Sequence, residues 1–290
     1  MDWSELVELS CAGAPLDRQR AALRDGLRRR GIGEQAIAHV MASALDGIGL
    51  STNLPAGAGR FGGPGVLPHG VGWPRLPGFP EWHLGFLREI VLDGLPPAAP
   101  LPSSGRLLVF QDMESFGAER YDLGTTRVFF VDAAQPTVVC EPPSNTLWPL
   151  PAKLLGARAL PLLGDPYVTA GAVAAEDRHA VETALDDLQN AQWHTARHRL
   201  LGAASEVQEL LPEAIRRELA QLPPDQRARF SAELQRGDGW RLLLQVHGED
   251  DADIGLSFGI MDAGALYICV PAEDLPAARF DRALGFAQTP

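Results

Sequence analysis

Glycine and proline are packed so densely between residues 53 and 102 that no long helix can form there. Eight glycines lie between Gly57 and Gly78, and six prolines lie between Pro55 and Pro80. Proline lacks the N–H that a helix interior needs, and glycine favours turns. We therefore expect this part of the chain to consist of short strands joined by turns.

Helical periodicity flanks this region on both sides. Residues 16–30 place leucines and alanines between arginines, and residues 34–45 resume the pattern after the glycines at 31 and 33. We interpret residues 1–50 as an N-terminal helical appendage, a hairpin. The patterns at residues 174–201, 212–222 and 224–235 also predict helices, which together form a helical insertion at about residues 174–236.

Apolar and β-branched runs predict strands between the helical regions. Residues 106–111 and 127–132 are expected to be antiparallel neighbours, and residues 240–247 and 265–270 are two further strands. These strands, with the turns around them, indicate an α+β fold.

The two halves of the chain resemble each other. Leu87-Arg88-Glu89-Ile90, followed by the run that starts at Gly105, parallels Leu243-Leu244-Gln245-Val246, followed by the run that starts at Gly264; a shorter likeness links Asp93-Gly94-Leu95-Pro96 to Asp274-Leu275-Pro276. A chance match of short apolar strands is the alternative. We predict a duplicated antiparallel β-rich core with units at about 51–143 and 237–290, in which the strands of Glu89 and Gln245 are equivalent.

Composition excludes several classes of protein. The net charge is −12 and Lys153 is the only lysine, whereas a nucleic-acid binder needs clustered basic side chains. No apolar run approaches the roughly 20 residues that span a bilayer, and the first residues do not resemble a secretory signal. Three separated cysteines favour reduced thiols. We expect a cytoplasmic protein that binds neither nucleic acid nor membrane; the oligomeric state stays open.

Seven short motifs occur in the order seen in one family. They are Arg60-Phe61-Gly62-Gly63 with Leu67-Pro68, Trp73-Pro74, Phe86-Leu87-Arg88-Glu89-Ile90, Leu101-Pro102 with Gly105-Arg106, His198-Arg199-Leu200-Leu201-Gly202 with Gln208, Trp240 to Gln245, and Asp262 with Gly264 and Tyr267. From about residue 50 to the C-terminus the chain resembles the YwqG-like family, also called DUF1963. The family usually has Gln where Glu89 stands, and a Pro-containing turn where Ala203-Ala204-Ser205 follows. The resemblance implies an α+β fold with a duplicated β-rich core, and no established reaction; it leaves residues 51–290 as one YwqG-like domain.

No motif predicts a cofactor or a metal. His194 and His198 have the i, i+4 spacing of metal ligands, but Thr195 stands where a zincin has Glu, and arginines flank the pair. The acidic run from Gly248 to Asp253 lacks the ligand order of a calcium loop. The glycines around Arg60 lack the lysine and the helix of a phosphate loop.

Polar residues inside apolar strands are the remaining candidates. Glu89, Gln111, Asp112 and Gln245 must either pair across the sheet or line a cleft. The large aromatic side chains of Trp73, Trp82 and Trp240 are expected to be largely buried near the strands.

Two acidic segments suggest what the protein binds. Residues 174–190 carry five acids against one arginine, and residues 237–262 carry six against one. Such charge attracts basic partners, although it also serves solubility. The candidate binding residues are Arg60, Glu89, Asp112, Arg127, Gln245, Glu249, Asp250, Asp251, Asp253 and Asp262.

We therefore expect a non-catalytic binding protein, of the immunity or antitoxin type, that covers a basic, toxin-like partner. The alternative is an enzyme that acts on a small molecule in a cleft between the two β units. Glu89, Asp112 and Asp262 would then serve as acid or base, and Arg60 or Arg127 would hold an anion.

Overall fold

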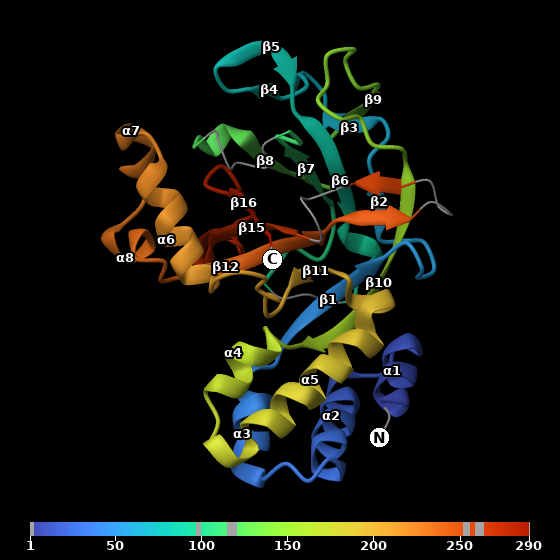
Figure 1. Ribbon diagram of the computed structural model, residues 1–290. Coiled ribbons are helices and arrows are strands. Elements are labelled where there is room, and N and C mark those ends of the chain that lie inside the picture. The colour runs from blue at the N-terminus through green and yellow to red at the C-terminus, as the bar shows by residue number, and fades with distance from the viewer. Residues whose placement is uncertain (1–2, 97–99, 115–120, 252–255, 259–263, 290) are drawn as a thin grey trace.

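A computed structural model describes residues 3–96, 100–114, 121–251, 256–258 and 264–289, without the side chains of residues 193–196, 249–251 and 256–258. One sheet of ten strands dominates it (Figure 1). Its strands are β1 (Leu45–Ser51), β2 (Gly59–Phe61), β6 (Gly85–Val91), β7 (Arg106–Gln111), β8 (Thr126–Val131), β10 (Lys153–Leu162), β11 (His198–Leu201), β12 (Trp240–His247), β15 (Ala265–Pro271) and β16 (Leu284–Gln288).

Three two-stranded sheets accompany it: β3 (Gly65–Pro68) with β9 (Thr137–Cys140), β4 (Arg75–Leu76) with β5 (Phe79–His83), and β13 (Glu249–Asp251) with β14 (Leu256–Phe258). The α-helices are α1 (Ser4–Cys11), α2 (Leu16–Arg29), α3 (Glu34–Ser43), α4 (Pro166–Gly171), α5 (Ala175–Ala196), α6 (Leu211–Gln221), α7 (Pro224–Arg227) and α8 (Ala232–Gln235). Three single 3-10 turns are η1 (Leu92–Gly94), η2 (Leu123–Thr125) and η3 (Ala272–Asp274). The fold is α+β, and its Gly/Pro-rich segment forms short strands and turns as predicted.

The strand order of the large sheet repeats from its two edges inward. It runs β8, β7, β6, β2, β10 from one edge and β16, β15, β12, β11, β1 from the other, with β10 and β1 paired in the centre. All of these pairs are antiparallel, including the predicted pair of β7 and β8. The core is therefore a duplication, built from two units of the same topology.

A β-bulge marks the same point in both units. The register shifts between Phe86 and Arg88 in β6, and between Leu242 and Leu244 in β12. A bulge inserts one extra residue into a strand and bends the strand there. The two strands therefore bend at equivalent positions.

The residues beyond the bulge confirm this equivalence. Glu89 pairs with Leu108, and Gln245 pairs with Tyr267, which is the alignment that the sequence likeness predicts. The shorter likeness does not belong to the repeat. Asp93 lies in η1, between β6 and β7, whereas Asp274 lies in η3, between β15 and β16.

In chain order, the first unit begins with β1 and the second begins with β10. In the sheet, each of these two strands lies beside strands of the other unit. β1 precedes β2 in the chain but lies between β10 and β11, and β10 precedes β11 but pairs with β2. The predicted helix at residues 34–45 consequently ends at Ser43, and Leu45 begins the strand. Gly47 allows this close packing, because a Cβ there would lie 2.9 Å from the Cα of Gly202.

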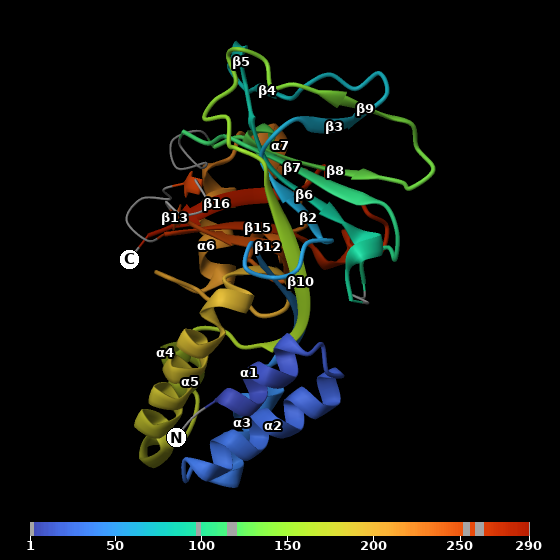
Figure 2. The same cartoon turned by 90° about the vertical axis from the view of Figure 1, so that its right-hand side faces the viewer.

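The sheet curls until its two edges approach each other, as Figure 2 shows from the side. A Cβ on Gly285 of β16 would lie only 2.1 Å from Oγ1 of Thr126 on β8. The largest apolar cluster draws on both units, with Leu107, Val109, Leu244 and Ile268 among its buried members.

The helices form two groups. Helices α1, α2 and α3 pack against α5 in a separate apolar cluster, in which the indole N–H of Trp3 donates to the carbonyl of Ala184 at 3.1 Å. Helices α6 and α8 instead cover the second unit, against Trp240 and Tyr267. The predicted insertion thus divides, with α5 joining the N-terminal helices. The single helix predicted at residues 224–235 is two short helices.

The prediction for the tryptophans is right for Trp240, partly right for Trp73 and wrong for Trp82. Trp240 is buried, and its indole N–H donates to the carbonyl of Leu234. Trp73 is half-buried, and its indole N–H donates to Leu84. Trp82 is 43% exposed on β5, because that hairpin stands away from the large sheet, so the prediction for it was wrong.

Candidate functional site

A groove of about 410 Å³ lies where the helical cluster meets the second β unit, at the junction of α4, β1 and β12 that can be followed in Figure 1. Cavities of this size hold small molecules or single side chains. Its lining mixes apolar and polar side chains, and the charged residues in it are Asp165, Glu206 and Arg241. We call it the acidic groove. The side chains and backbone around it are Ser43, Leu45, Gly164, Asp165, Val168, Thr169, Gly202, Ala203, Ala204, Glu206, Leu211, Trp240, Arg241 and Leu242.

Glu206 belongs to a loop, residues 202–210, that connects β11 to α6. Residues 203–209 form neither helix nor strand, so the shape of the loop depends on side chains of the sheet beneath it. Gln245 provides two of these contacts: its Oε1 accepts from the N–H of Ser205 at 2.9 Å, and its Nε2 donates to the carbonyl of Ser205 at 2.8 Å. The hydroxyl of Tyr267 donates to the same carbonyl at 2.7 Å.

Two more buried side chains hold the ends of the loop. Oε1 of Gln288 accepts from the N–H groups of Val207 and Gln208 at 3.0 and 3.1 Å, and its Nε2 donates to the carbonyl of Glu209. Nη1 of Arg199 donates to the carbonyls of Ala203 and Leu163. Backbone groups that are paired in this way fix the loop despite its lack of regular structure.

The last residue of β11 and the first residue of the loop are both left-handed. Leu201 has φ 59° and Gly202 has φ 77°. A leucine rarely adopts this conformation, which persists only where the surrounding contacts impose it. The strained turn therefore lies at the edge of the acidic groove, where Gly202 is part of the lining.

The environment of Glu206 disfavours its charged form. Burial raises the pKa of the carboxyl, and the nearby Asp165 adds to the rise. Hydrogen bonds from the backbone N–H groups of Glu206, Asp165 and Leu211 lower the pKa of this carboxyl, but by less than burial raises it. A buried carboxylate beside a second carboxylate is stabilised by any cation that enters.

Asp165 has a structural role as well as a charge. Its Oδ1 accepts from the N–H of Val168 at 3.0 Å, so it caps α4, whose first residue is Pro166. Within the described part of the chain, neither Asp165 nor Glu206 forms an ion pair. A third carboxyl, that of Asp186, lies nearby, and its pKa is raised by burial and then by Glu182, Asp165 and Asp187.

Arg199 lies beneath this site. Burial lowers the pKa of its guanidinium to about 10, against the opposing effects of Tyr267 and Glu206. At neutral pH the group stays charged, and its bonds to two backbone carbonyls hold it in place. Tyr267 is buried in the same region, which raises the pKa of its hydroxyl, so it acts as a neutral donor.

A second pocket of about 230 Å³ adjoins the acidic groove. The two share Leu45, Gly202, Arg241 and Leu242 as a common ridge. Mostly apolar groups line the second pocket: Leu45, Pro100, Leu201, Gly202, Leu242, Ala272 and Leu275, with Asp46 and Arg241. The carboxylate of Asp46 is already paired with Arg20 at 2.6 Å.

The predicted site residues lie in different places. Glu89 is buried between two arginines: its Oε2 accepts from Nε of Arg60 at 2.8 Å, and its Oε1 accepts from Nη1 of Arg106 at 2.8 Å. Gln245, at the equivalent position of the second unit, holds the loop of the acidic groove. The structure thus makes Glu89 part of an ion-pair network across three strands.

Gln111 and Asp112 end strand β7 and are buried. Oε1 of Gln111 accepts from the hydroxyl of Thr126 at 2.7 Å, and Oδ1 of Asp112 accepts from the N–H of Glu114 at 3.1 Å. Arg127 is exposed on the edge strand β8. None of the three lines the acidic groove.

The acidic run and the histidine pair are only partly described. The backbones of Glu249, Asp250 and Asp251 form β13, but their side chains lie outside the described residues, as do Asp253 and Asp262 entirely. The side chain of His194 is also outside them. His198 is buried with its Nδ1 accepting from the N–H of His247, and burial, then Arg88 and Arg197, hold its pKa well below the usual range.

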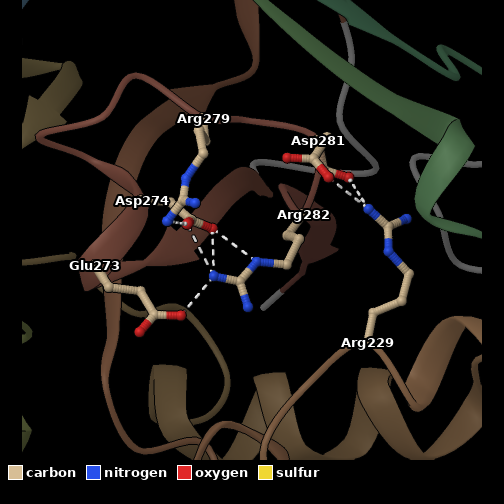
Figure 3. A network of polar contacts seen from close by, with 6 residues as sticks. All are labelled: Arg229, Glu273, Asp274, Arg279, Asp281 and Arg282. Carbon is tan, nitrogen blue, oxygen red and sulfur yellow. Dashed lines mark hydrogen bonds and ion pairs between the residues drawn. The ribbon is translucent and has the colours of Figure 1, made fainter.

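A different polar network fixes the connection from β15 to β16 (Figure 3). Asp274 is buried and accepts two hydrogen bonds of 2.8 Å from Arg282, and Arg279 lies 3.0 Å from the same carboxylate. Arg282 also contacts Glu273, and Arg229 pairs with Asp281. All of these carboxylates are paired, so the network fixes the chain and is not an open site.

Sequence reasoning missed Asp165 and Glu206. The Asp165-Pro166 pair is a helix-start signal, which identifies a cap but not a groove. Nothing local distinguishes Glu206, because its burial is produced by Gln245 and Gln288 from distant strands.

A family model matches most of the chain. The family model described as "Domain of unknown function (DUF1963)" covers residues 59–288. No curated protein matches the chain. None of the described helices is long and apolar enough to cross a membrane.

Proposed function

The chain belongs to the DUF1963 family, a domain of unknown function, and we propose that it is a non-catalytic binding protein whose acidic groove holds a cationic side chain of a protein partner. One observation carries the proposal. The groove contains a half-buried glutamate, Glu206, whose pKa is raised by burial and which has no ion-pair partner among the described residues. Arg199 interacts electrostatically with Glu206 from beneath, but no ion pair closes the groove side, where a lysine or arginine side chain would add positive charge beside Glu206 and Asp165.

The construction of the loop supports this proposal. A buried charge costs stability unless it is compensated. Gln245, Tyr267, Gln288 and Arg199 together hold the loop in the one arrangement that keeps Glu206 in the groove. Several motifs that carry the family resemblance, those around residues 198–202, 240–245 and 267, meet at this loop.

The partner that fits is basic. A toxin of basic charge, which a cytoplasmic immunity or antitoxin-type protein would cover, has this chemistry. Nucleic acid does not fit, because its phosphates would be repelled by the carboxylates of the groove.

Tetralysine labelled with a fluorophore tests the proposal by fluorescence anisotropy. We expect it to bind more tightly than labelled tetraglutamine, with tetraglutamate not binding. Glu206→Gln keeps the shape of the side chain and should reduce the affinity for tetralysine severalfold. Asp165→Ser keeps a helix cap and removes the charge, so it should also weaken binding. Equal affinity for tetralysine and tetraglutamine, or no effect of Glu206→Gln, contradicts the proposal.

An enzyme is the second candidate, because a carboxyl with a raised pKa in a groove is also suited to general acid or base catalysis. Glu206 would then be the reacting group, in a cleft beside the second unit rather than between the two units. Mass spectrometry separates the two functions for a bound peptide. A binding protein returns the peptide unchanged after prolonged incubation, whereas a catalyst alters its mass.

A further inference from the structure

We propose that the acidic groove and the second pocket together recognise one extended peptide segment, with a lysine or arginine in the groove and an apolar side chain in the second pocket. The inference rests on the proposed function and adds the sequence character of the partner. The two cavities are neighbours, since Leu45, Gly202, Arg241 and Leu242 line both.

The walls of the acidic groove fit a long basic side chain. Val168, Leu211, Trp240 and Leu242 are apolar, and the carboxylate of Glu206 lies among them. Lysine and arginine have the same division, with an apolar stem and a charged end. A compact cation without a stem would leave these walls uncovered.

The second pocket fits an uncharged side chain. Its volume of about 230 Å³ is bounded mainly by leucines, alanine and proline, and the acid in its lining, Asp46, is neutralised by Arg20. Arg241 lines both cavities, so its charge does not distinguish them. Asp165 and Glu206 line only the acidic groove, so a cationic side chain is favoured there and an uncharged one in the second pocket.

The rim between solvent and groove is unusually apolar. Leu45 is 47% exposed and Val168 is 41% exposed, and both line the groove. Large apolar side chains exposed together beside a cavity are typical of a binding surface. A peptide backbone that crosses the ridge would cover them, and a small amine in the groove alone would not.

The test uses fluorophore-labelled octapeptides of glycine and serine that carry Lys alone, Leu alone, or Lys and Leu separated by zero to three residues. At least one peptide with both should bind roughly tenfold more tightly than the Lys peptide, a factor that corresponds to about 1.4 kcal/mol. The Leu peptide should bind more weakly than the Lys peptide, since it brings no positive charge to the carboxylates of Asp165 and Glu206.

Two matched variants locate the gain. Ala272→Trp fills the second pocket from a half-buried position and should abolish the advantage of the added Leu. Ala277→Trp places the same side chain at an exposed position outside both cavities and should leave the advantage intact. The comparison of peptides on the parent protein needs neither variant, so it decides the proposal even where Ala272→Trp does not fold.

The outcomes separate the two proposals. Equal affinities for the Lys peptide and for every Lys-Leu peptide, all weakened by Glu206→Gln, overturn the two-pocket proposal and leave the proposed function standing. Binding that Glu206→Gln does not weaken, or no binding of any peptide, overturns both. An advantage of Leu that survives Ala272→Trp also overturns the two-pocket proposal.

Discussion

Glu89 and Gln245 occupy equivalent places in the two β units, but their side chains make different contacts. Each lies two residues beyond the bulge in the second strand of its unit. The carboxylate of Glu89 forms ion pairs with Arg60 and Arg106, while the amide of Gln245 forms hydrogen bonds with the backbone of Ser205. One unit uses the position to join three strands, and the other uses it to shape a loop.

This difference suggests how a duplicated fold acquires a site. The position is buried in both units, so a polar residue there must find partners. In the first unit the partners are side chains of neighbouring strands, and no open surface results. In the second unit the partner is a loop, and a groove results.

The largest effect is expected at the ion pairs of the first unit. Glu89→Ala leaves Arg60, which is largely buried, and Arg106, which is half-buried, without their carboxylate, and should lower the free energy of unfolding by about 3 kcal/mol. Urea unfolding measures this loss. Glu81→Ala, at an exposed position on β5, is the control and should change the free energy little. A loss below about 1 kcal/mol for Glu89→Ala would show that the network contributes little to stability.

A smaller loss of stability, joined to a loss of binding, is expected at Gln245. Gln245→Ala removes both hydrogen bonds to Ser205 and should cost about 1–3 kcal/mol. Affinity for tetralysine should also fall, because the loop that carries Glu206 loses its anchor. Gln208→Ala changes an exposed residue of the same loop and should affect neither quantity. An unchanged affinity for tetralysine in Gln245→Ala would show that binding in the groove does not depend on the hydrogen bonds of Gln245 to the loop.

Tyr267 offers a finer test of the same loop. Tyr267→Phe removes one donor to a carbonyl that Gln245 still satisfies, so the cost should be near the lower end of the usual range, about 0.5 kcal/mol. Tyr121→Phe, at an exposed hydroxyl, is the control. A cost well above 1.5 kcal/mol would mean that Tyr267, and not Gln245, is the principal anchor of the loop.

The smallest effect has the opposite sign. Because the pKa of Glu206 is raised in the folded protein, its charge destabilises the fold above that pKa, and the penalty disappears as pH falls below the ordinary glutamate value. Glu206→Gln should therefore melt slightly above the parent at neutral pH and equally with it in acid. Glu213→Gln, exposed on α6, should match the parent throughout. A lower melting temperature at neutral pH for Glu206→Gln would mean that its carboxylate stabilises the fold.

The sequence predicts the duplication because the likeness between its halves covers the bulge and the register around Glu89 and Gln245. It does not reveal the central strands. Gly47 and Gly49 in β1, and Gly156 and Pro161 in β10, are residues that local preference keeps out of strands, and only the tight packing of the sheet centre explains them.

The site is less predictable than the fold. Gln245 can be recognised as a polar residue in an apolar strand, but its partner, Ser205, lies 40 residues away in a loop without a pattern. Glu206 looks like any surface acid in the sequence. Its position in the groove is a product of tertiary contacts, which no local pattern records.

The pKa of Glu206 tests the central claim most directly. NMR titration of ¹³C-labelled glutamate side chains, with Glu206→Gln to assign the resonance, gives this value in the free protein and with tetralysine. The account predicts a pKa above the usual glutamate range in the free protein and a lower one with tetralysine bound, since a cation favours the carboxylate. A pKa in the usual range, or one that tetralysine leaves unchanged, would contradict it.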